Sequence, residues 1–436
     1  MPRRQPAVSS TLNRKLPPPI QEVQQLVLPQ PEEIRLDNGI PVYVLDYPDQ
    51  EIVKIEVVYR AGRPDEHKRL AARATARLLR DGSRRHTGAE IAELIDFYGG
   101  TFSVPTNLDT SSFVLMGLKK YAGELLPVFA EALLEPVFPE KELDTFRQTH
   151  IAELLVELEK PEVRAYREVT ERIFGSDHPY GYNSQPSDYE ALTRDDLLRH
   201  YERCHVPERC RIFASGRIDE ALLARLNALF GQTPSGTHQK DGRSFGSEPP
   251  SHEKPGSVHL SHPGSLQTAI KIGRRLFPRR HPDFDGIFVL NTLLGGYFGS
   301  RLMMNIREKR GYTYNIYSTA DAMLHDGCFY IATEVNSDKA AVTVREIMAE
   351  MRHLCERPVE NEELSMVRGY LLGMLLNGLD GPVNASDLVR NLIVDELPRD
   401  AFDRLVHTVR HISATELQAL ARKYLQPEDY WIVTVG

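Results

Sequence analysis

The sequence predicts an α+β fold of two homologous domains, each an antiparallel-rich sheet with helices packed on one face. Three observations predict it: a stretch with the composition of a linker near the middle, an internal repeat on either side of it, and strand patterns segregated from paired helix patterns in each repeat. The chain has 436 residues, of which 41% are hydrophobic, so it is long enough for two or three domains with their own cores. No run approaches the roughly 18 consecutive apolar residues that a membrane-spanning helix needs, so no membrane contact is expected.

The linker is expected at residues 231–257. Glycine, proline and serine make up 14 of these 27 residues, and Phe245 is the only large apolar side chain among them. Such a segment cannot bury enough apolar surface to offset the entropy lost on ordering, so we expect it to be flexible. It separates an N-terminal domain at 22–230 from a C-terminal domain at 258–436, and residues 1–21 are expected to form a flexible tail.

The two predicted domains repeat each other in sequence. At an offset of 220, four identities recur: Leu197 with Leu417, Pro207 with Pro427, Glu208 with Glu428 and Gly216 with Gly436. Upstream, Glu142-Leu143 and Phe146-Arg147 match Glu363-Leu364 and Val367-Arg368 at an offset of 221. A register held over about 75 residues indicates a duplicated domain.

The elements of the first domain follow from local patterns. An Asp37-Asn38-Gly39 turn precedes two runs rich in β-branched and aromatic residues, which predicts strands. In the segment 123–134 apolar residues recur at i, i+3, i+4, i+7 and i+8 from Leu125, which predicts a helix with one apolar face. The expected elements are strands at 41–45 and 53–59, helices at about 70–79, 123–134, 140–173 and 194–204, and a strand at 211–215.

Charge and cysteine content exclude some classes of partner and compartment. The formal charge is −8, from 61 acidic and 53 basic residues, which argues against nucleic-acid binding. Four cysteines form no CxxC pair and are interpreted as structural thiols in a reducing compartment. The acid-free start of the tail is also a weak organelle-targeting signature, but it lacks the apolar core of a secretory signal, so a cytoplasmic location is expected.

Common catalytic motifs are missing from the sequence. We find no GxSxG, no GxxxxGK[ST], no GxGxxG after a strand and no CxxC. His407 and His411 have the i, i+4 spacing of a helical zinc site, but Arg410 stands where a general-base Glu would be, and a cation there opposes metal binding. His259 and His262, near a probable strand start, are interpreted as ordinary structural or surface residues.

The segment at 290–314, LNTLLGGYFGSRLMMNIREKRGYTY, resembles the C-terminal-domain signature of the insulinase/pitrilysin zinc metallopeptidases and the mitochondrial processing peptidase. The duplication, the linker and the length also resemble the short two-domain members of that family. The resemblance implies that Arg307 and Tyr314 are catalytic, as donors to the scissile carbonyl that stabilise the oxyanion. The alternative is that Arg307 caps a helix and Tyr314 packs in a sheet.

The family's zinc motif, His-x-x-Glu-His, is lost from this sequence. Counting back from Gly82-Ser83 places Arg73 and Arg77 at the two imidazole positions and Ala76 at the general-base position. A guanidinium has no lone pair to donate, so no metal or other cofactor is expected in this chain. The family's third ligand has a match in Glu153, while a further family acid corresponds to Phe146. We hypothesise that Glu153 pairs with Arg73 or Arg77.

A third family element is altered as well. Members of the family follow a GlyGly with a strand whose edge accepts substrate as an added strand. Here Gly99-Gly100 leads into a segment with Pro105, which removes one backbone donor from that edge. Peptide docking in this half should therefore be weakened.

The resemblance implies a subunit that keeps the substrate-holding residues and lacks the zinc site. The leading hypothesis is a catalytically incomplete subunit of a heterodimeric zinc endopeptidase, whose homologous partner carries HxxEH and the zinc, the two chains facing each other as halves of a clamshell around unfolded peptides. The isolated chain could form a homodimer. One alternative is a non-catalytic structural or peptide-binding homologue, and another, an independent metallopeptidase with a non-standard site, would require stoichiometric zinc.

Overall fold

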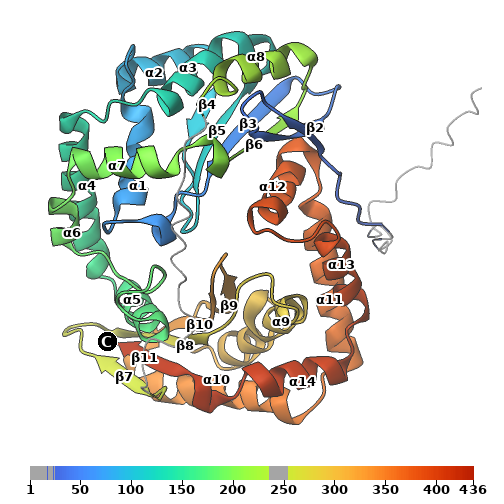
Figure 1. The fold of residues 1–436 in the computed structure, drawn as a ribbon. Coiled ribbons are helices and arrows are strands. Elements are labelled where there is room, and N and C mark those ends of the chain that lie inside the picture. Colours follow the sequence, from blue (N-terminus) through green and yellow to red (C-terminus); the bar gives the residue numbers. More distant parts are fainter. Residues whose placement is uncertain (1–16, 18–22, 24, 235–253) are drawn as a thin grey trace, which may run out of the picture.

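The computed structural model describes Pro17, Val23 and residues 25–234 and 254–436. The rest of the predicted tail and residues 235–253 of the predicted linker lie outside the described residues, and the predicted domain boundaries stay predictions. The fold contains two sheets that face each other across the centre of the molecule (Figure 1). Among the described residues, no helix combines the length and the apolar character needed to cross a membrane. The predicted cytoplasmic location stays a prediction.

The first sheet has six strands in the order β1-β2-β6-β3-β5-β4. Only β2 and β6 pair in parallel, and the other neighbours are antiparallel. Gly39, with φ +87°, makes the predicted turn between β1 and β2. The strands are β1 Glu32–Arg35, β2 Pro41–Asp46, β3 Ile52–Tyr59, β4 Thr101–Ser103, β5 Ser111–Leu118 and β6 Cys210–Gly216.

The second sheet repeats this order, β7-β11-β8-β10-β9, and among the described residues it has no counterpart of β1. Again one pair, β7 with β11, is parallel and the others are antiparallel. The strands are β7 Ser257–Leu260, β8 Gln267–Arg275, β9 Ile316–Ala322, β10 Gly327–Asn336 and β11 Trp431–Val435. The predicted fold class, two homologous antiparallel-rich α+β units, is confirmed.

The helices repeat with the offsets read from the sequence. Helices α7 and α14 have 11 residues each and start 220 positions apart, and each begins with a capping box, Thr193 with Asp196 and Ser413 with Glu416. The expected long helix at 140–173 is two helices, because Pro161 starts a new one. The first half contains α1 Ala71–Leu78, α2 Gly88–Phe97, α3 Ala122–Leu134, α4 Glu140–Leu158, α5 Pro161–Phe174, α6 Pro186–Glu190, α7 Arg194–Cys204 and α8 Glu220–Phe230. The second contains α9 Phe284–Asn291, α10 Ala340–Glu356, α11 Asn361–Asn377, α12 Gly381–Val394, α13 Ala401–His411 and α14 Ala414–Tyr424.

The two halves exchange one helix each. Helix α5 packs on β8 and β11 of the second sheet, and α12 packs on β6 and β2 of the first (Figure 1). Alternate residues of β8 and β10 enter two different apolar clusters, one with the helices of their own half and one with α5, so both faces of this sheet are covered. The exchange ties the two halves together through apolar contacts.

Helix α12 also joins the first sheet through buried charges. The Lys54 ammonium lies 2.6 Å from a carboxylate oxygen of Asp387 and 3.3 Å from one of Glu56. The Arg390 Nε lies 3.4 Å from the other Glu56 oxygen. Because the Glu56 side chain is almost completely buried, these two cations offset the cost of removing its carboxylate from water.

Candidate functional site

Helix α1 presents the altered zinc-motif positions to a cavity. Its buried face consists of Ala71, Ala74, Thr75 and Leu78, whereas Arg73 and Arg77 are exposed on the other side. A cavity of about 300 Å³ is lined by Arg73, Ala76 and Arg77, by His150 of α4 and by residues of the segment 104–111. The three positions at which the resemblance expects the zinc motif therefore line one cavity.

A buried carboxylate fixes the start of α1. Glu66 accepts a hydrogen bond from the Ala72 backbone N–H at 3.0 Å and another from the Tyr182 hydroxyl at 2.7 Å. Burial raises the pKa of Glu66 to about 7, although both hydrogen bonds and Arg63 oppose the rise. The residue before the helix, Leu70, has a left-handed φ of +70°, so the entry to α1 is a strained turn held by these contacts.

The opposite wall of the cavity, the segment 104–110, is fixed by long-range contacts. The Arg63 N–H donates to the Leu108 carbonyl at 2.7 Å, and a Cβ on Gly62 would lie 2.2 Å from that oxygen, so only glycine permits this approach. The Asp109 carboxylate accepts hydrogen bonds from the Tyr180 hydroxyl and, at 3.0 Å, from the Leu324 N–H between β9 and β10. The segment thus connects the first half to the second.

The hypothesis that Glu153 pairs with Arg73 or Arg77 is wrong. Glu153 instead contacts Nδ1 of His150 at 2.6 Å, and its side chain is 60% exposed. Arg73 donates to the Tyr189 hydroxyl at 3.3 Å. One turn of α4 separates His150 from Glu153, so side chains three positions apart meet before either reaches α1. Burial lowers the pKa of His150, and the nearby Arg73 and Arg77 lower it further.

The residues of this cavity do not fit a zinc ion. A metal site needs three or four lone-pair donors, and α1 offers two guanidinium groups and a methyl group. Across residues 25–234 and 254–436, no three His, Cys, Asp or Glu side chains are grouped as ligands. Zinc chemistry therefore cannot be assigned to the side chains of this cavity.

Arg307 and Tyr314 lie in different surroundings. Arg307 belongs to the π-helical segment Met303–Lys309, a distortion that recurs at functional sites, and its guanidinium stacks 4.6 Å from the centre of the Phe298 ring. Tyr314 precedes β9, is 91% exposed and lines a cavity of about 290 Å³ beside Lys271. Arg307 is not part of that lining.

The surroundings of Tyr314 include a buried cation that the sequence did not indicate. Lys271 lies within 5.4 to 5.7 Å of the ring centres of Tyr166, Tyr317 and Tyr330. Burial lowers its pKa to about 8, which Glu162 and Glu334 oppose. Its burial could have been inferred from the sequence, where Lys271 stands between Ile270 and Ile272 in a strand.

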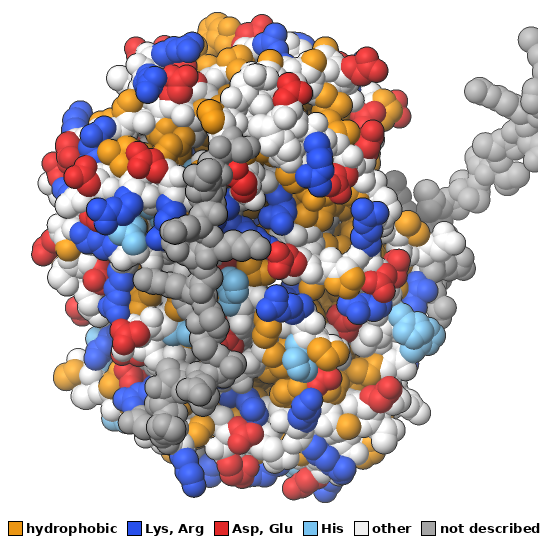
Figure 2. Space-filling model, viewed as in Figure 1, with side chains coloured by type: hydrophobic (Ala, Val, Ile, Leu, Met, Phe, Trp, Pro, Cys, Tyr) orange, Lys and Arg blue, Asp and Glu red, His pale blue; other side chains and the backbone are white. Residues whose placement is uncertain are grey.

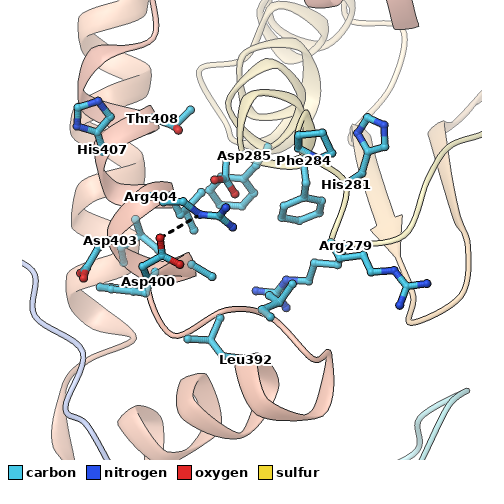
Figure 3. A pocket seen from close by; sticks show the side chains of 18 of the residues that line it. Arg279, His281, Phe284, Asp285, Leu392, Asp400, Asp403, Arg404, His407 and Thr408 are labelled. Atoms are coloured by element: carbon cyan, nitrogen blue, oxygen red, sulfur yellow. Dashed lines mark ion pairs between the residues drawn. The ribbon is translucent and has the colours of Figure 1, made fainter.

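A larger cavity lies away from both groups of predicted site residues. It measures about 990 Å³ and is lined by α9, α12, α13 and the loop before α9. Figure 3 shows Asp285 and Arg404 turned toward each other across this space, with Arg404 also 4.0 Å from Asp400. His407 lines it, and its ring centre lies 4.5 Å from that of His411, but the described part of the chain brings no third possible metal ligand to this pair.

The other two histidines discussed from the sequence, His259 and His262, form polar contacts within the protein. His259 on β7 lies 3.0 Å from the Thr434 hydroxyl, and His262 lies 2.9 Å from an Arg164 guanidinium nitrogen. All four cysteines are buried free thiols. On the face drawn in Figure 2, basic and acidic side chains are interspersed among the described residues.

Comparison with known proteins agrees with this geometry. Residues 191–371 match the family model described as the peptidase M16 inactive domain. The predicted resemblance to a peptidase family is confirmed. The chain is 24% identical over 409 residues to an uncharacterized zinc protease of Mycobacterium tuberculosis, covering 91% of each chain. It is 23% identical over 393 residues to a protein of Helicobacter pylori named non-peptidase homolog YmxG, covering 88% of each.

Solved structures of two other proteins share the fold. A protease from Helicobacter pylori superposes with a TM-score of 0.86 at 17% identity, covering 94% of this chain and 100% of the other. The peptidase M16 inactive domain from Pseudomonas fluorescens gives 0.83 at 21% identity, covering 93% and 98%. At this identity the similarity establishes the two-domain fold alone.

Proposed function

We propose that this M16 homologue is a catalytically incomplete subunit of a zinc endopeptidase. It supplies Arg307 and Tyr314 to a homologous partner chain that carries the HxxEH motif and the zinc, and the pair encloses unfolded peptides. The match to a family model described as an inactive domain supports the first part of this proposal, that the chain lacks a complete active site. The donor set on α1 supports it too, because the residues at 73, 76 and 77 cannot ligate metal.

The observation that carries the proposal is the state of Tyr314. A tyrosine that is 91% exposed has a hydroxyl free to donate to a ligand, and packing in a sheet does not account for it. Arg307 is held on one side by the exposed Phe298 ring and by Glu308, 3.6 Å away, which leaves other guanidinium N–H groups available. Two such donors on a scissile carbonyl would stabilise the oxyanion that forms there.

The test is complementation with the HxxEH-bearing homologue from the same genome. Cleavage of a quenched-fluorescent peptide should rise well above the rate of the partner alone when this chain is added. Arg307→Ala and Tyr314→Phe should each reduce that gain by about 10²-fold, the usual effect of losing one oxyanion donor. Lys309→Ala, an exposed cation in the same turn, should keep the gain. A partner that is fully active alone would refute the proposal.

A second candidate is a structural or peptide-binding homologue without a catalytic role. The name of the Helicobacter pylori relative, a non-peptidase homolog, and the contact of Arg307 with Phe298 favour it. In that case Arg307→Ala would lower the melting temperature and leave peptide cleavage by the mixture unchanged.

A further inference from the structure

The cavity beside α1 carries positive charge without acidic side chains. Arg63, Arg73 and Arg77 all line it, together with the imidazole of His150. No Asp or Glu belongs to its lining. Guanidinium groups stay protonated at any physiological pH, so the cavity keeps this charge throughout.

The arginines have few partners among the described residues. Arg73 donates to the neutral Tyr189 hydroxyl, and Arg63 donates to the carbonyls of Pro179 and Tyr182 at 3.4 Å. Glu66, behind the start of α1, offsets part of the Arg63 charge. The Arg77 side chain forms no hydrogen bond and no ion pair within residues 25–234 and 254–436, and its charge acts on nearby Asp81. Arg73 and Arg77, one helical turn apart, therefore keep N–H donors available on one side of α1: those of Arg73 that do not contact Tyr189, and those of Arg77.

The rest of the lining is neutral and partly apolar. Ala61, Ala76, Val104, Pro105 and Leu108 supply apolar surface beside the guanidinium groups. The volume of about 300 Å³ is at the small end of ligand-binding cavities. Such a space suits an anionic group that has apolar atoms attached to it, because a bare, strongly hydrated ion would gain nothing from those walls.

We propose that this cavity, the Arg73–Arg77 cavity, binds a peptide carboxylate, from a C-terminus or from an acidic side chain. The planar forks of Arg73 and Arg77 match the two oxygens of a carboxylate, and paired N–H donors bind that group in a bidentate manner. The segment 104–110 forms the facing wall in advance, held by the contacts of Gly62 and Asp109 described above. Binding requires neither a partner chain nor Arg307, so the site stands or falls independently of the proposed function.

The test is calorimetric titration of the isolated full chain with matched peptides. Acetyl-tetraalanine with a free C-terminal carboxylate is compared with its C-terminal amide, and acetyl-Ala-Ala-Glu-Ala-amide with the Gln version. In at least one pair, the charged peptide should bind about tenfold or more tightly, as for a charge-assisted hydrogen bond gained. The pair that shows the difference identifies the source of the carboxylate.

Substitutions of single arginines test whether the preference for the charged peptide arises in the Arg73–Arg77 cavity. Arg73→Gln and Arg77→Gln should each remove most of the preference for the charged peptide. The melting temperature should change little for Arg77→Gln, because that side chain has no hydrogen bond or ion pair to lose among the described residues and only a Coulomb interaction with Asp81. Arg84→Gln removes an exposed charge seven positions further along and should leave the preference unchanged. Equal binding of charged and neutral peptides, or equal effects of Arg77→Gln and Arg84→Gln, would overturn the proposal. So would inorganic phosphate that binds as tightly as the peptide acid, since the apolar walls would then contribute nothing.

Discussion

Gly62→Ala tests whether the close approach of two backbone segments shapes the Arg73–Arg77 cavity. The backbone of Gly62, with φ −93° and ψ −166°, is open to any residue, so the substitution adds no conformational strain. The new Cβ, however, would lie 2.2 Å from the Leu108 oxygen and 2.3 Å from the Asp109 carbonyl carbon, where contact normally begins at 3.4 Å. Both neighbours are backbone atoms and cannot rotate away.

The cost of this substitution follows from two terms. Moving the segment 104–110 by more than an ångström repacks a close contact, which costs about 1–3 kcal/mol. It also breaks the 2.7 Å hydrogen bond from the Arg63 N–H to the Leu108 carbonyl, worth about 1 kcal/mol. We therefore expect Gly62→Ala to lower the free energy of unfolding by about 2–4 kcal/mol.

Urea denaturation followed by circular dichroism measures this loss, with Gly369→Ala as the matched control. Gly369 lies within α11, and a Cβ there would meet no atom within 4 Å. The same chemical change should therefore stabilise that helix by up to about 1 kcal/mol. If Gly62→Ala unfolds at the urea concentration of the wild type, the contact between Gly62 and the segment 104–110 does not limit stability, and the argument for a pre-formed wall fails.

Three further changes test other features. Arg390→Met should cost about 2–4 kcal/mol in urea denaturation, because buried Glu56 loses one of its two cations, and adding Glu56→Gln should recover most of the loss; additive losses would argue against the ion pair. Burial lowers the pKa of His200 to about 4, because the folded protein favours the neutral imidazole. The contribution of His200 to the free energy of unfolding is therefore fully present above pH 6.5 and is lost as the pH falls toward 4. The difference in unfolding free energy between wild type and His200→Gln should therefore shrink by roughly 3 kcal/mol between pH 6.5 and 4, and a pH-independent difference would contradict the burial of a neutral imidazole. Finally, Arg73→His with Ala76→Glu and Arg77→His places two imidazoles one turn apart near α4, and elemental analysis should find about one zinc per chain, against none in the wild type; zinc in the wild type would contradict the account of α1.

The sequence was enough to predict the architecture because a duplication constrains two halves at once. Leu197 and Leu417 are both buried at the same position of helices with the same capping box, so the 220-residue offset carried real structural information. The exchange of α5 and α12 between the halves was not predicted. Local periodicity identifies a helix and its apolar face but does not say which of two similar sheets that face covers.

The candidate site was predicted in part for the same reason. Counting along α1 placed Arg73, Ala76 and Arg77 on one side of a helix, because that depends only on helical spacing. The prediction of a partner for Glu153 was wrong, because His150 on the same helix lies closer to Glu153 than α1 does. Arg63 and the segment 104–110 join the cavity through Gly62, Asp109 and Leu324, and contacts between residues so distant in sequence leave no local pattern.

The two faces of α1 explain how the fold can persist without metal ligands. The helix is held by the burial of Ala71, Ala74, Thr75 and Leu78 and by the hydrogen bond from the Ala72 N–H to Glu66. Residues 73, 76 and 77 contribute little to this packing, because both arginine side chains extend from the exposed face. Their identity can therefore vary at small cost to folding, while it decides the chemistry of the cavity: imidazoles would offer lone pairs, whereas guanidinium groups offer N–H donors. The anion binding proposed above uses these N–H donors on a helix whose packing does not depend on them.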